Sequence, residues 1–523
     1  MTTVEKTKSL RAEYTEDDTE AENVYMGYDS LDDAIADSEY TSQPEVLARM
    51  LSRENVFISG PAGSGKSAVV QQYVEIMKKQ FGETLSIAVT GTTGFVAASV
   101  GGSTIHSWSG VGIGTTVKFV PPAVEATDVL IIDEISMLPA YYLDLVDKAC
   151  RRGKRRYDLP FGGIQVILLG DFKQLPPVPN RDLDSSFDQR FAYFSEAWKA
   201  AEVKMCYLDK IHRSKDQKLT KVLQDIENGT VNQGTVDLLR ARKIGYQSPD
   251  PEKTYTRLYT LNKKVDEINE AELAKNPNAR KTYKRTIVRV GPNRAEQDKA
   301  MKTVSQPEQV SIKEGAKVMI TKNGMYEVVS PKTFRPVDMV YAANGSVGKV
   351  VKIMGPRDPL RGHVAVKLNS GDIVAVGMAS DSKDRHEITG KTPEGKPVTK
   401  KVQILDIQYM PLRLAYAITV HKSQGQTLDG VIADLSKCFT PGLGYVALSR
   451  VSSLDDLIIE GMNKKTFMID PTSKKISKRL KQLAKQNRKE LLEERDIYET
   501  VLDNPTSRYV FWQEKLDEIM RTV

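Results

Sequence analysis

The sequence predicts an α/β fold with two domains built on parallel β-sheets and a small antiparallel β-barrel inserted into the second domain. Three observations lead to this prediction: short apolar runs that recur from Val56 onward, a helical pattern between the first two runs, and one stretch of alternating character. The length of 523 residues agrees with it, because a single hydrophobic core stops growing beyond about 250–300 residues.

The parallel strands are predicted from apolar runs rich in β-branched residues, which are typical of strands buried on both faces of a sheet. In chain order these runs are VFIS, LSIAVT, VLIID, IQVILLGD, RLYTLN, VIADL and YVALSR. Between the first two lies SAVVQQYVEIMKKQF, in which Val70, Tyr73, Val74 and Met77 recur at helical spacing. Strand, glycine loop, helix and strand open a doubly wound domain. The pattern resumes after about residue 201, which indicates a second such domain.

The predicted barrel, residues 343–405, alternates apolar and polar residues in NGSVGKVVKIMG, HVAVKLNSGDIVAVG and KKVQILDIQ. Its turn signals are Asn344-Gly345 and Ser370-Gly371, pairs that favour tight connections between antiparallel strands. We therefore place the first α/β domain at residues 41–200, and the second at residues 201–342 together with 406–472.

Both ends of the chain differ in charge from the middle. Residues 1–40 are rich in Asp and Glu, which predicts a disordered acidic leader. Residues 473–523 include SKKISKRLKQLAKQNRKELLEE, which predicts a basic helical extension. Two interpretations of the extension stay open, a solvated amphipathic helix or a tail that binds DNA. Either end could also contact a protein partner.

Composition excludes several classes of protein. No apolar run approaches the roughly 20 residues that span a bilayer, so we expect no membrane partner. The acidic N-terminus does not resemble a secretory signal. Three widely spaced cysteines, Cys150, Cys206 and Cys438, argue against a disulfide framework or a zinc site. We expect a cytoplasmic protein, associated with the nucleoid or, if viral, located in the host cytoplasm.

The sequence GPAGSGKS at residues 60–67 matches a phosphate-binding loop in every fixed position. Its members are Gly60, Pro61, Ala62, Gly63, Ser64, Gly65, Lys66 and Ser67. The glycines let backbone N–H groups turn toward a phosphate at the start of the next helix. Lys66 is then expected to reach the β- and γ-phosphates, and the Ser67 hydroxyl to ligate Mg²⁺. The pattern predicts ATP and Mg²⁺ as ligands.

Polar side chains follow two other buried strands at the point where each strand ends. Asp133 ends VLIID and Glu134 follows it. Asp133 would hold Mg²⁺ through water, and Glu134 would orient or deprotonate the attacking water. Gly170, Asp171 and Gln174 follow IQVILL, and the Gln174 amide is a candidate sensor of the γ-phosphate. Ligands bind at the carboxyl ends of such strands.

Taken together, the motifs resemble those of superfamily-one helicases of the B branch, and specifically the PIF-type (petite-integration-frequency) DNA helicases. The resemblance runs from about Gln43 to Glu460, and the segment EISML…LDLVDKA resembles one peculiar to this group. The ordered motifs are GPAGSGKS, TGTTGFVAASVGGSTIHSW, IIDEISML, FGGIQVILLGDFKQLPPV, NGSVGKVV, PLRLAYAITVHKSQGQTLD and GYVALSRV.

The resemblance implies further residues of the nucleotide site. Gln43 lies where the family has its adenine-reading glutamine. Arg213 in YLDKIHRS and Arg450 in YVALSR fall on two arginines that reach across the domain cleft to the γ-phosphate. Such arginines neutralise the charge that spreads over the equatorial oxygens during transfer. Gly425 turns a loop that contacts both ATP and DNA.

The resemblance also implies a set of DNA-contacting residues. They are Gly91, Thr92, Gly94, Thr104, His106 and Trp108 in the first domain, and His421, Lys422, Ser423 and Gln424 in the second. For Trp108, core packing and base stacking are both open interpretations. Residues 109–125 would form a small wedge hairpin that separates the two strands of a duplex.

The family would make both α/β units RecA-like P-loop NTPase domains, with single-stranded DNA bound across them. The implied function is an ATP-dependent helicase that moves 5′→3′ on single-stranded DNA, acts on forked duplexes and is monomeric on DNA. A RecD-like or Dda-like helicase of the same branch is the alternative. A small-molecule kinase or GTPase-type switch would lack the second arginine-bearing domain. A DNA-binding module with a degenerate ATP site would lack the intact catalytic residues.

Overall fold

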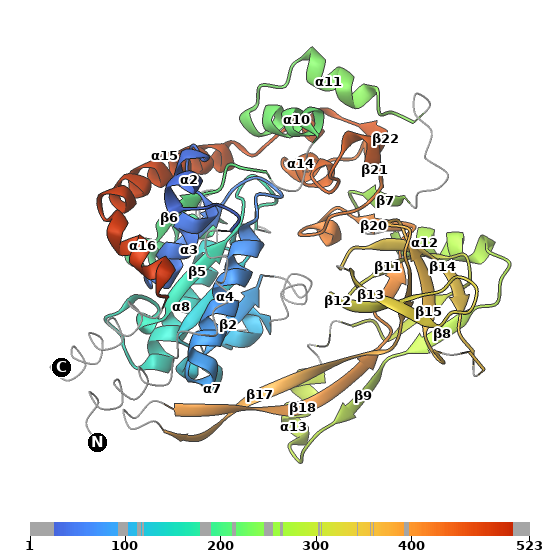
Figure 1. Ribbon diagram of the computed structural model, residues 1–523, viewed down its shortest axis with the longest axis horizontal. Coiled ribbons are helices and arrows are strands. Elements are labelled where there is room, and N and C mark those ends of the chain that lie inside the picture. The colour runs from blue at the N-terminus through green and yellow to red at the C-terminus, as the bar shows by residue number, and fades with distance from the viewer. Residues whose placement is uncertain are drawn as a thin grey trace.

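The structure is a computed structural model that describes residues 26–505 except for some internal segments. Those segments are 93–102, 112–116, 118–119, 178–189, 212–215, 245–254, 262–264, 302–303, 305, 343, 356, 359 and 392–396. Figure 1 shows the first α/β domain on the left, the second at the upper right and an antiparallel β lobe at the lower right. The α/β fold class predicted from the sequence is thereby confirmed.

The first domain is built on a six-stranded parallel sheet in the order β3-β2-β4-β5-β1-β6. The strands are β1 (Val56–Ser59), β2 (Ile87–Gly91), β3 (Ser103–Thr104), β4 (Val129–Asp133), β5 (Gln165–Leu169) and β6 (Lys204–Tyr207). Side chains alternate between two apolar clusters, with Phe57 and Leu130 in one and Val56, Ile58 and Val129 in the other. Both faces are therefore buried, which explains why these strands read as continuous apolar runs.

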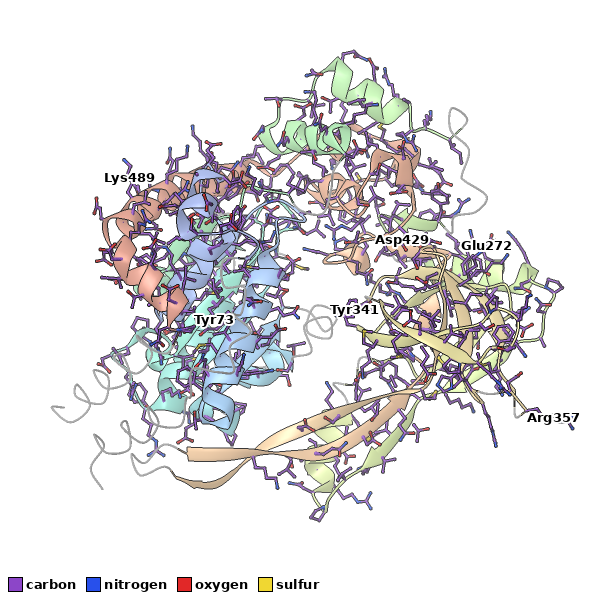
Figure 2. The ribbon with its side chains drawn as sticks, in the orientation of Figure 1. Tyr73, Glu272, Tyr341, Arg357, Asp429 and Lys489 are labelled. Atoms are coloured by element: carbon purple, nitrogen blue, oxygen red, sulfur yellow. The ribbon has the colours of Figure 1, made fainter. Side chains whose placement is uncertain are left out.

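Helices cover both faces of this sheet. They include α3 (Gln43–Leu51), α4 (Lys66–Phe81), α6 (Ile105–Ser109), α8 (Ala140–Lys154) and α9 (Glu196–Ala200). Helix α4 realises the predicted apolar stripe: Tyr73 is fully buried and its hydroxyl donates to Gln165 Oε1 at 3.0 Å. Figure 2 shows Tyr73 inside this domain.

The second domain has a four-stranded parallel sheet in the order β20-β7-β21-β22. The strands are β7 (Thr256–Tyr259), β20 (Ala417–Thr419), β21 (Val431–Leu435) and β22 (Leu457–Met462), and the helices α10 (Gln217–Asn228), α11 (Gln233–Arg240) and α14 (Leu443–Leu448) pack with them.

One predicted strand of the second domain is wrong. The run YVALSR, residues 445–450, lies mostly on helix α14, where all six helical residues are buried. A helix buried on every side reads like a short buried strand, because its apolar run lacks the polar gaps of an amphipathic pattern. A close approach requires Gly444, since a Cβ there would lie 2.1 Å from the Thr466 carbonyl oxygen.

The antiparallel lobe is larger than the predicted residues 343–405. Its seven-stranded sheet has the order β13-β12-β16-β15-β14-β11-β19. The strands are β11 (Lys317–Ile320), β12 (Gly324–Val329), β13 (Pro336–Ala342), β14 (Val347–Ile353), β15 (Val364–Leu368), β16 (Ile373–Val376) and β19 (Leu412–Leu414). Strands β11 to β13 therefore belong to the lobe and not to the second α/β domain. Ser370-Gly371 does connect β15 to β16, with Gly371 at φ 102°.

A long hairpin leaves this lobe and passes below the first domain (Figure 1). It consists of β17 (Ala379–Lys391) and β18 (Pro397–Tyr409), and β18 also pairs with β9 (Thr286–Arg289). Both long strands contact helix α7 (Pro122–Ala126). Helix α7 lies in the predicted wedge, residues 109–125, of which 112–116 and 118–119 are outside the described residues. Of the other described residues of that range, Ser109 ends helix α6, and residues 110–111, 117 and 120–121 are in no helix or strand.

The C-terminal extension returns to the first domain. Helices α15 (Pro471–Glu493) and α16 (Arg495–Asp503) lie against it in Figure 1. The apolar stripe of α15, with Ile476, Leu480 and Ala484, belongs to the core of the first domain, whereas Lys489 is on its outer side (Figure 2). The described end of the predicted leader is also structured, as helix α2 (Leu31–Ala36). Within the described ranges, no helix has the length and apolarity needed to cross a membrane.

Candidate active site

The loop between β1 and α4 has the backbone shape that phosphate binding requires. Gly60, Gly63 and Gly65 have φ values of 151°, 84° and 84°, which residues with a Cβ atom rarely adopt. At Gly60 a Cβ would lie 2.3 Å from the Leu208 carbonyl oxygen. The loop ends at the N-terminus of a 16-residue helix, where free backbone N–H groups and the helix dipole favour an anion.

Lys66 folds back onto this loop. Its Nζ donates to the carbonyl oxygens of Gly60 and Pro61 at 2.8 and 2.9 Å. Burial lowers the pKa of Lys66, while the negative charges of Asp171 and Glu134 oppose that shift. The ammonium is therefore held by weak neutral acceptors in a site whose N–H donors suit a triphosphate. Ser67, next in the helix, is exposed toward solvent.

Two carboxylates stand at the end of β4, beside the loop. Asp133 Oδ1 accepts a hydrogen bond from the Glu134 backbone N–H at 2.8 Å. Glu134 has a left-handed backbone with φ 54°, which is uncommon for a residue with a Cβ. Thr92 supports it, donating from its hydroxyl to the Glu134 carbonyl oxygen at 3.2 Å. Burial, and then the charge of Asp133, raise the pKa of Glu134 to about 7.

The second domain reaches these residues through Gln424. Its Nε2 donates to Gln174 Oε1 at 3.3 Å and lies 3.5 Å from Glu134 Oε2. The backbones are also close here, because a Cβ on Gly442 would lie 2.6 Å from the Gln174 carbonyl oxygen. Gln424, which the sequence assigns to DNA, is thus buried against the catalytic candidates of the first domain.

Arg450 organises the turn that carries Gln424. Its guanidinium donates to the carbonyl oxygens of Ser423, Gln426 and Val446 at 3.2, 3.1 and 2.7 Å. The side chain is buried, and its positive charge lowers the pKa of Glu134 against the larger effect of burial. Arg450 therefore acts on the site across the domain boundary. Arg213, its predicted counterpart, lies outside the described residues.

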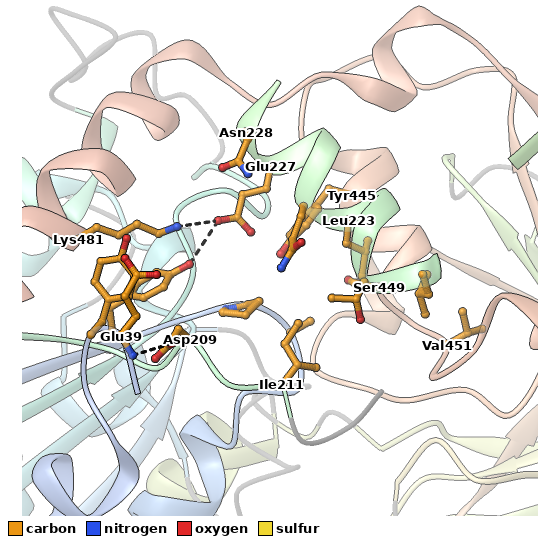
Figure 3. A pocket seen from close by; sticks show the side chains of 17 residues that line it. Glu39, Asp209, Ile211, Leu223, Glu227, Asn228, Tyr445, Ser449, Val451 and Lys481 are labelled. Carbon is orange, nitrogen blue, oxygen red and sulfur yellow. Dashed lines mark hydrogen bonds and ion pairs between the residues drawn. The ribbon is translucent and has the colours of Figure 1, made fainter. Parts of the chain in front are cut away.

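A cavity of about 250 Å³ continues from the loop between the two domains. Pro61 and Ala62 of the loop line it. Leu223, Tyr445 and Ser449 of the second domain line it as well (Figure 3). Gln43, the first residue of α3, donates from Nε2 to the Ser64 carbonyl oxygen at 3.4 Å. The predicted adenine-reading residue thus contacts the phosphate-binding loop.

The DNA candidates of the first domain cluster next to β2. Gly91 ends β2 and pairs with Asp133 and Thr104 on the neighbouring strands, and Thr104 caps α6. His106 is exposed, with its ring 4.2 Å from that of Tyr142. Gly94 is outside the described residues.

Trp108 is buried in the core of the first domain, with 7% of its surface exposed. It packs in the core and is not available for base stacking, so of its two interpretations the structure selects core packing.

The second-domain turn has an exposed and a buried side. His421 and Lys422 are exposed, and the His421 ring stacks on Phe439 with centroids 6.4 Å apart. Gly425 is exposed at φ 77°. Ser423 is buried, and its hydroxyl donates to the Val420 carbonyl oxygen at 2.7 Å. Only the exposed residues can meet a ligand on the outer surface.

Sequence reasoning missed three residues of this region. Lys173 is adjacent to Gln174 in the same motif, so its position was a usable signal. Tyr445, whose hydroxyl lies 3.5 Å from Asp171 Oδ2, stands in the run predicted as a strand. Glu227 is the last residue but one of α10 and carries no local motif that marks it.

Comparisons with known proteins agree with this geometry. The model of the PIF1-like helicase family matches residues 42–236. The ATP-dependent DNA helicase Pif1 of Psychrobacter is 35% identical over 513 aligned residues, covering 90% of this chain and 74% of that protein.

Among solved structures, Bacteroides Pif1 with ADP-AlF4 has a TM-score of 0.67 at 26% identity, covering 84% of this chain and 96% of that one. Bacteroides Pif1 bound to single-stranded DNA has a TM-score of 0.56 at 27% identity, covering 85% and 97%. The phosphate-binding loop, the paired carboxylates and the interdomain glutamine contacts are accordingly those of a chain that belongs to the Pif1 family of ATP-dependent DNA helicases.

Proposed function

We propose that the protein hydrolyses ATP between its two RecA-like domains and uses the resulting motion to travel 5′→3′ along single-stranded DNA and unwind duplexes. The observation that carries this proposal is the contact of Gln424 with both Glu134 and Gln174. One side chain of the second domain touches the proposed base and the proposed γ-phosphate sensor of the first. Chemistry in the cleft and the position of the second domain are then coupled.

Each first-domain residue has a role in this proposal. The loop N–H groups and Lys66 bind the phosphates, and Gln43 reads the adenine. Ser67 and Asp133 would hold Mg²⁺, which would supply positive charge against the phosphates. The Ser64 hydroxyl is buried in the loop and has no hydrogen-bond partner in the part of the chain that the structure describes, which supports a ligand there. Glu134 orients and deprotonates the attacking water, which suits a carboxylate whose pKa is raised to about 7.

Closure of the cleft is assigned to Gln174, Arg213 and Arg450. The Arg450 guanidinium donates to carbonyl oxygens and to the Ser449 hydroxyl of its own domain, and a γ-phosphate would attract it more strongly than those neutral acceptors do. ATP would draw the second domain toward the first, and product release would let it go. Alternating grip on the DNA backbone converts this closure into steps.

The DNA path is proposed to cross both domains. Gly91, Thr92, Gly94, Thr104 and His106 would serve the first domain. His421 and Lys422 would serve the second, with Gln424 transmitting from the same turn to the nucleotide. Solved relatives include Pif1 bound to single-stranded DNA and Pif1 at forked duplex DNA. The direction of movement rests on family resemblance, and one protein molecule per strand is the simplest assembly.

Unwinding of duplexes with either a 5′ or a 3′ single-stranded tail tests this proposal. We expect strand separation only with the 5′ tail, ATP hydrolysis stimulated by single-stranded DNA, and a loss of both of at least about 100-fold in Lys66→Ala. Exclusive use of the 3′ tail would overturn the direction. Hydrolysis indifferent to DNA would overturn the coupling.

A further inference from the structure

Glu227 of the second domain is surrounded by groups of the first domain and of the C-terminal helix. We call this set the Glu227 cluster: Glu227, Lys173, Tyr207 and Lys481. Figure 3 shows Glu227 and Lys481 facing one another beside the cavity that continues from the phosphate-binding loop. None of its members has a role in the proposed chemistry.

The cluster is joined by direct polar contacts. Glu227 Oε1 pairs with Lys173 Nζ, accepts from the Tyr207 hydroxyl at 3.3 Å and from Lys481 Nζ at 3.4 Å. Lys173 is 2% exposed, Glu227 9% and Lys481 27%. Burial would raise the pKa of Glu227, but Lys173 and Lys481 outweigh it and the pKa is lowered. The carboxylate is therefore charged and bridges two cations in a poorly solvated site.

The cluster connects three separate segments. Lys173 immediately precedes Gln174, so the ion pair touches the segment proposed to sense the γ-phosphate. Tyr207 ends β6, the neighbour of β1 in the sheet. Lys481 is on α15, and its Nζ lies 4.6 Å above the Tyr207 ring and 5.6 Å from that of Tyr40. Its charge is thus fixed by aromatic rings as well as by Glu227.

A buried pair of this kind holds its partners together, because removing one partner leaves an uncompensated charge in a low dielectric. Glu227 is the single member from the second domain. Any opening of the cleft on this side must therefore separate Glu227 from at least one cation of the first domain or of α15.

We propose that the Glu227 cluster is a latch that holds the two domains together beside the nucleotide cleft, and that Lys481 makes nucleotide affinity depend on the C-terminal helix. The proposal rests on the proposed function in placing ATP in this cleft. Lys481, Lys173 and Glu227 are positioning residues, and they preorganise the cleft by limiting how far it opens.

The first test compares Lys481→Met with Lys478→Met, an exposed residue of the same helix. Methionine keeps an alkyl chain over the tyrosine rings and removes only the charge. The measurement is equilibrium binding of a fluorescent ATP analogue to the full chain, with and without oligo-dT. We expect Lys481→Met to weaken binding about three- to tenfold, Lys478→Met to leave it unchanged, and Lys481→Arg to restore it. The kcat at saturating ATP should stay within about twofold in all three.

A double-mutant cycle with Glu227→Gln separates the latch from a direct contact between Lys481 and ATP. If the latch operates, adding Lys481→Met to Glu227→Gln produces little further loss, because its partner charge is already gone. Multiplicative losses would overturn the latch in favour of a direct contact. Should Glu227→Gln prove too unstable to purify, Glu227→Asp replaces it in the cycle, since the shorter side chain withdraws the carboxylate from Lys481 Nζ and keeps a negative charge in the cluster.

The outcomes distinguish this proposal from the proposed function. Equal affinities of Lys481→Met and Lys478→Met, with wild-type hydrolysis stimulated by DNA, would overturn the latch alone. Absence of DNA-stimulated hydrolysis in the wild type would overturn the proposed function, and the binding measurement would still decide the latch.

Discussion

The two α/β domains present their site residues in different ways. In the first, Asp133 ends a strand of a six-stranded sheet and Glu134 follows it directly. Gln174 lies in the loop after another strand, and Lys66 opens the helix that follows β1. In the second, Gln424 stands on a turn and Arg450 just after a short helix, and hydrogen bonds from Arg450 to two carbonyl oxygens hold that turn. Residues fixed by a sheet keep a constant geometry, which suits groups that catalyse ATP hydrolysis. A site fixed by a few hydrogen bonds suits a residue that changes partners as the domains move.

Arg450→Lys is the substitution expected to have the largest effect on the second-domain part of the site. Lysine keeps the positive charge but cannot span three carbonyl oxygens with a planar fork, so both the turn and the proposed γ-phosphate contact are lost. We expect kcat for DNA-stimulated ATP hydrolysis to fall about 100-fold or more. Steady-state kinetics at saturating ATP and DNA measures it.

Arg242→Lys is the matched control, because Arg242 is a second-domain arginine that pairs with Asp455 away from the cleft. Its kcat should match that of the wild type. Near-normal activity in Arg450→Lys would show that the second domain needs only a charge at this position.

Glu134→Gln tests whether the buried carboxyl group of Glu134 lowers the free energy of unfolding at neutral and higher pH. The pKa of Glu134 is raised from 4.5 to about 7, so the folded state holds a proton that the unfolded state releases between those values. Stability therefore falls as the pH rises through this window. We expect Glu134→Gln to be more stable than the wild type at pH 8, by about 1–3 kcal/mol, with the difference vanishing toward pH 4.

Thermal unfolding across that pH range measures this effect, and Glu75→Gln, exposed on α4, provides the control. A constant difference between Glu134→Gln and the wild type at every pH would contradict the raised pKa.

The smallest effects are expected when a buried and an exposed residue among the DNA candidates are replaced. Trp108→Phe removes a buried indole whose N–H has no hydrogen-bond partner among the described residues. We expect a loss of stability of about 1–2 kcal/mol and unchanged affinity for oligo-dT. Lys422 is exposed in the second domain, so Lys422→Ala should weaken the binding of oligo-dT and leave the stability unchanged. Weakened DNA binding by Trp108→Phe at unchanged stability would restore the base-stacking interpretation.

The first domain could be predicted well because its function and fold leave local marks. Strands buried on both faces give continuous apolar runs, and the phosphate-binding loop needs glycines at fixed positions. The run from Val129 to Asp133 therefore predicted both a strand and the position of the Asp133 carboxylate at its end. In the second domain the same reasoning misplaced residues 445–450, because a fully buried helix carries no amphipathic signal.

Contacts between distant segments had no comparable signal. Glu227 meets Lys481 across 254 positions of sequence, and Gln424 meets Glu134 across 290. Such pairs depend on how domains pack, whereas periodicity reports only what one element buries. The lysine-rich pattern of α15 likewise predicted a helix but not the surface that covers its apolar stripe.

The return of α15 to the first domain has a consequence for how the chain is made. The sheet of that domain is complete once Tyr207 has left the ribosome, yet Ile476, Leu480 and Ala484 are still missing from its core. At translation rates of about 5–20 residues per second, the uncovered face waits on the order of tens of seconds. The domain that is synthesised first is therefore the last to complete its core, and an apolar face stays exposed in the meantime.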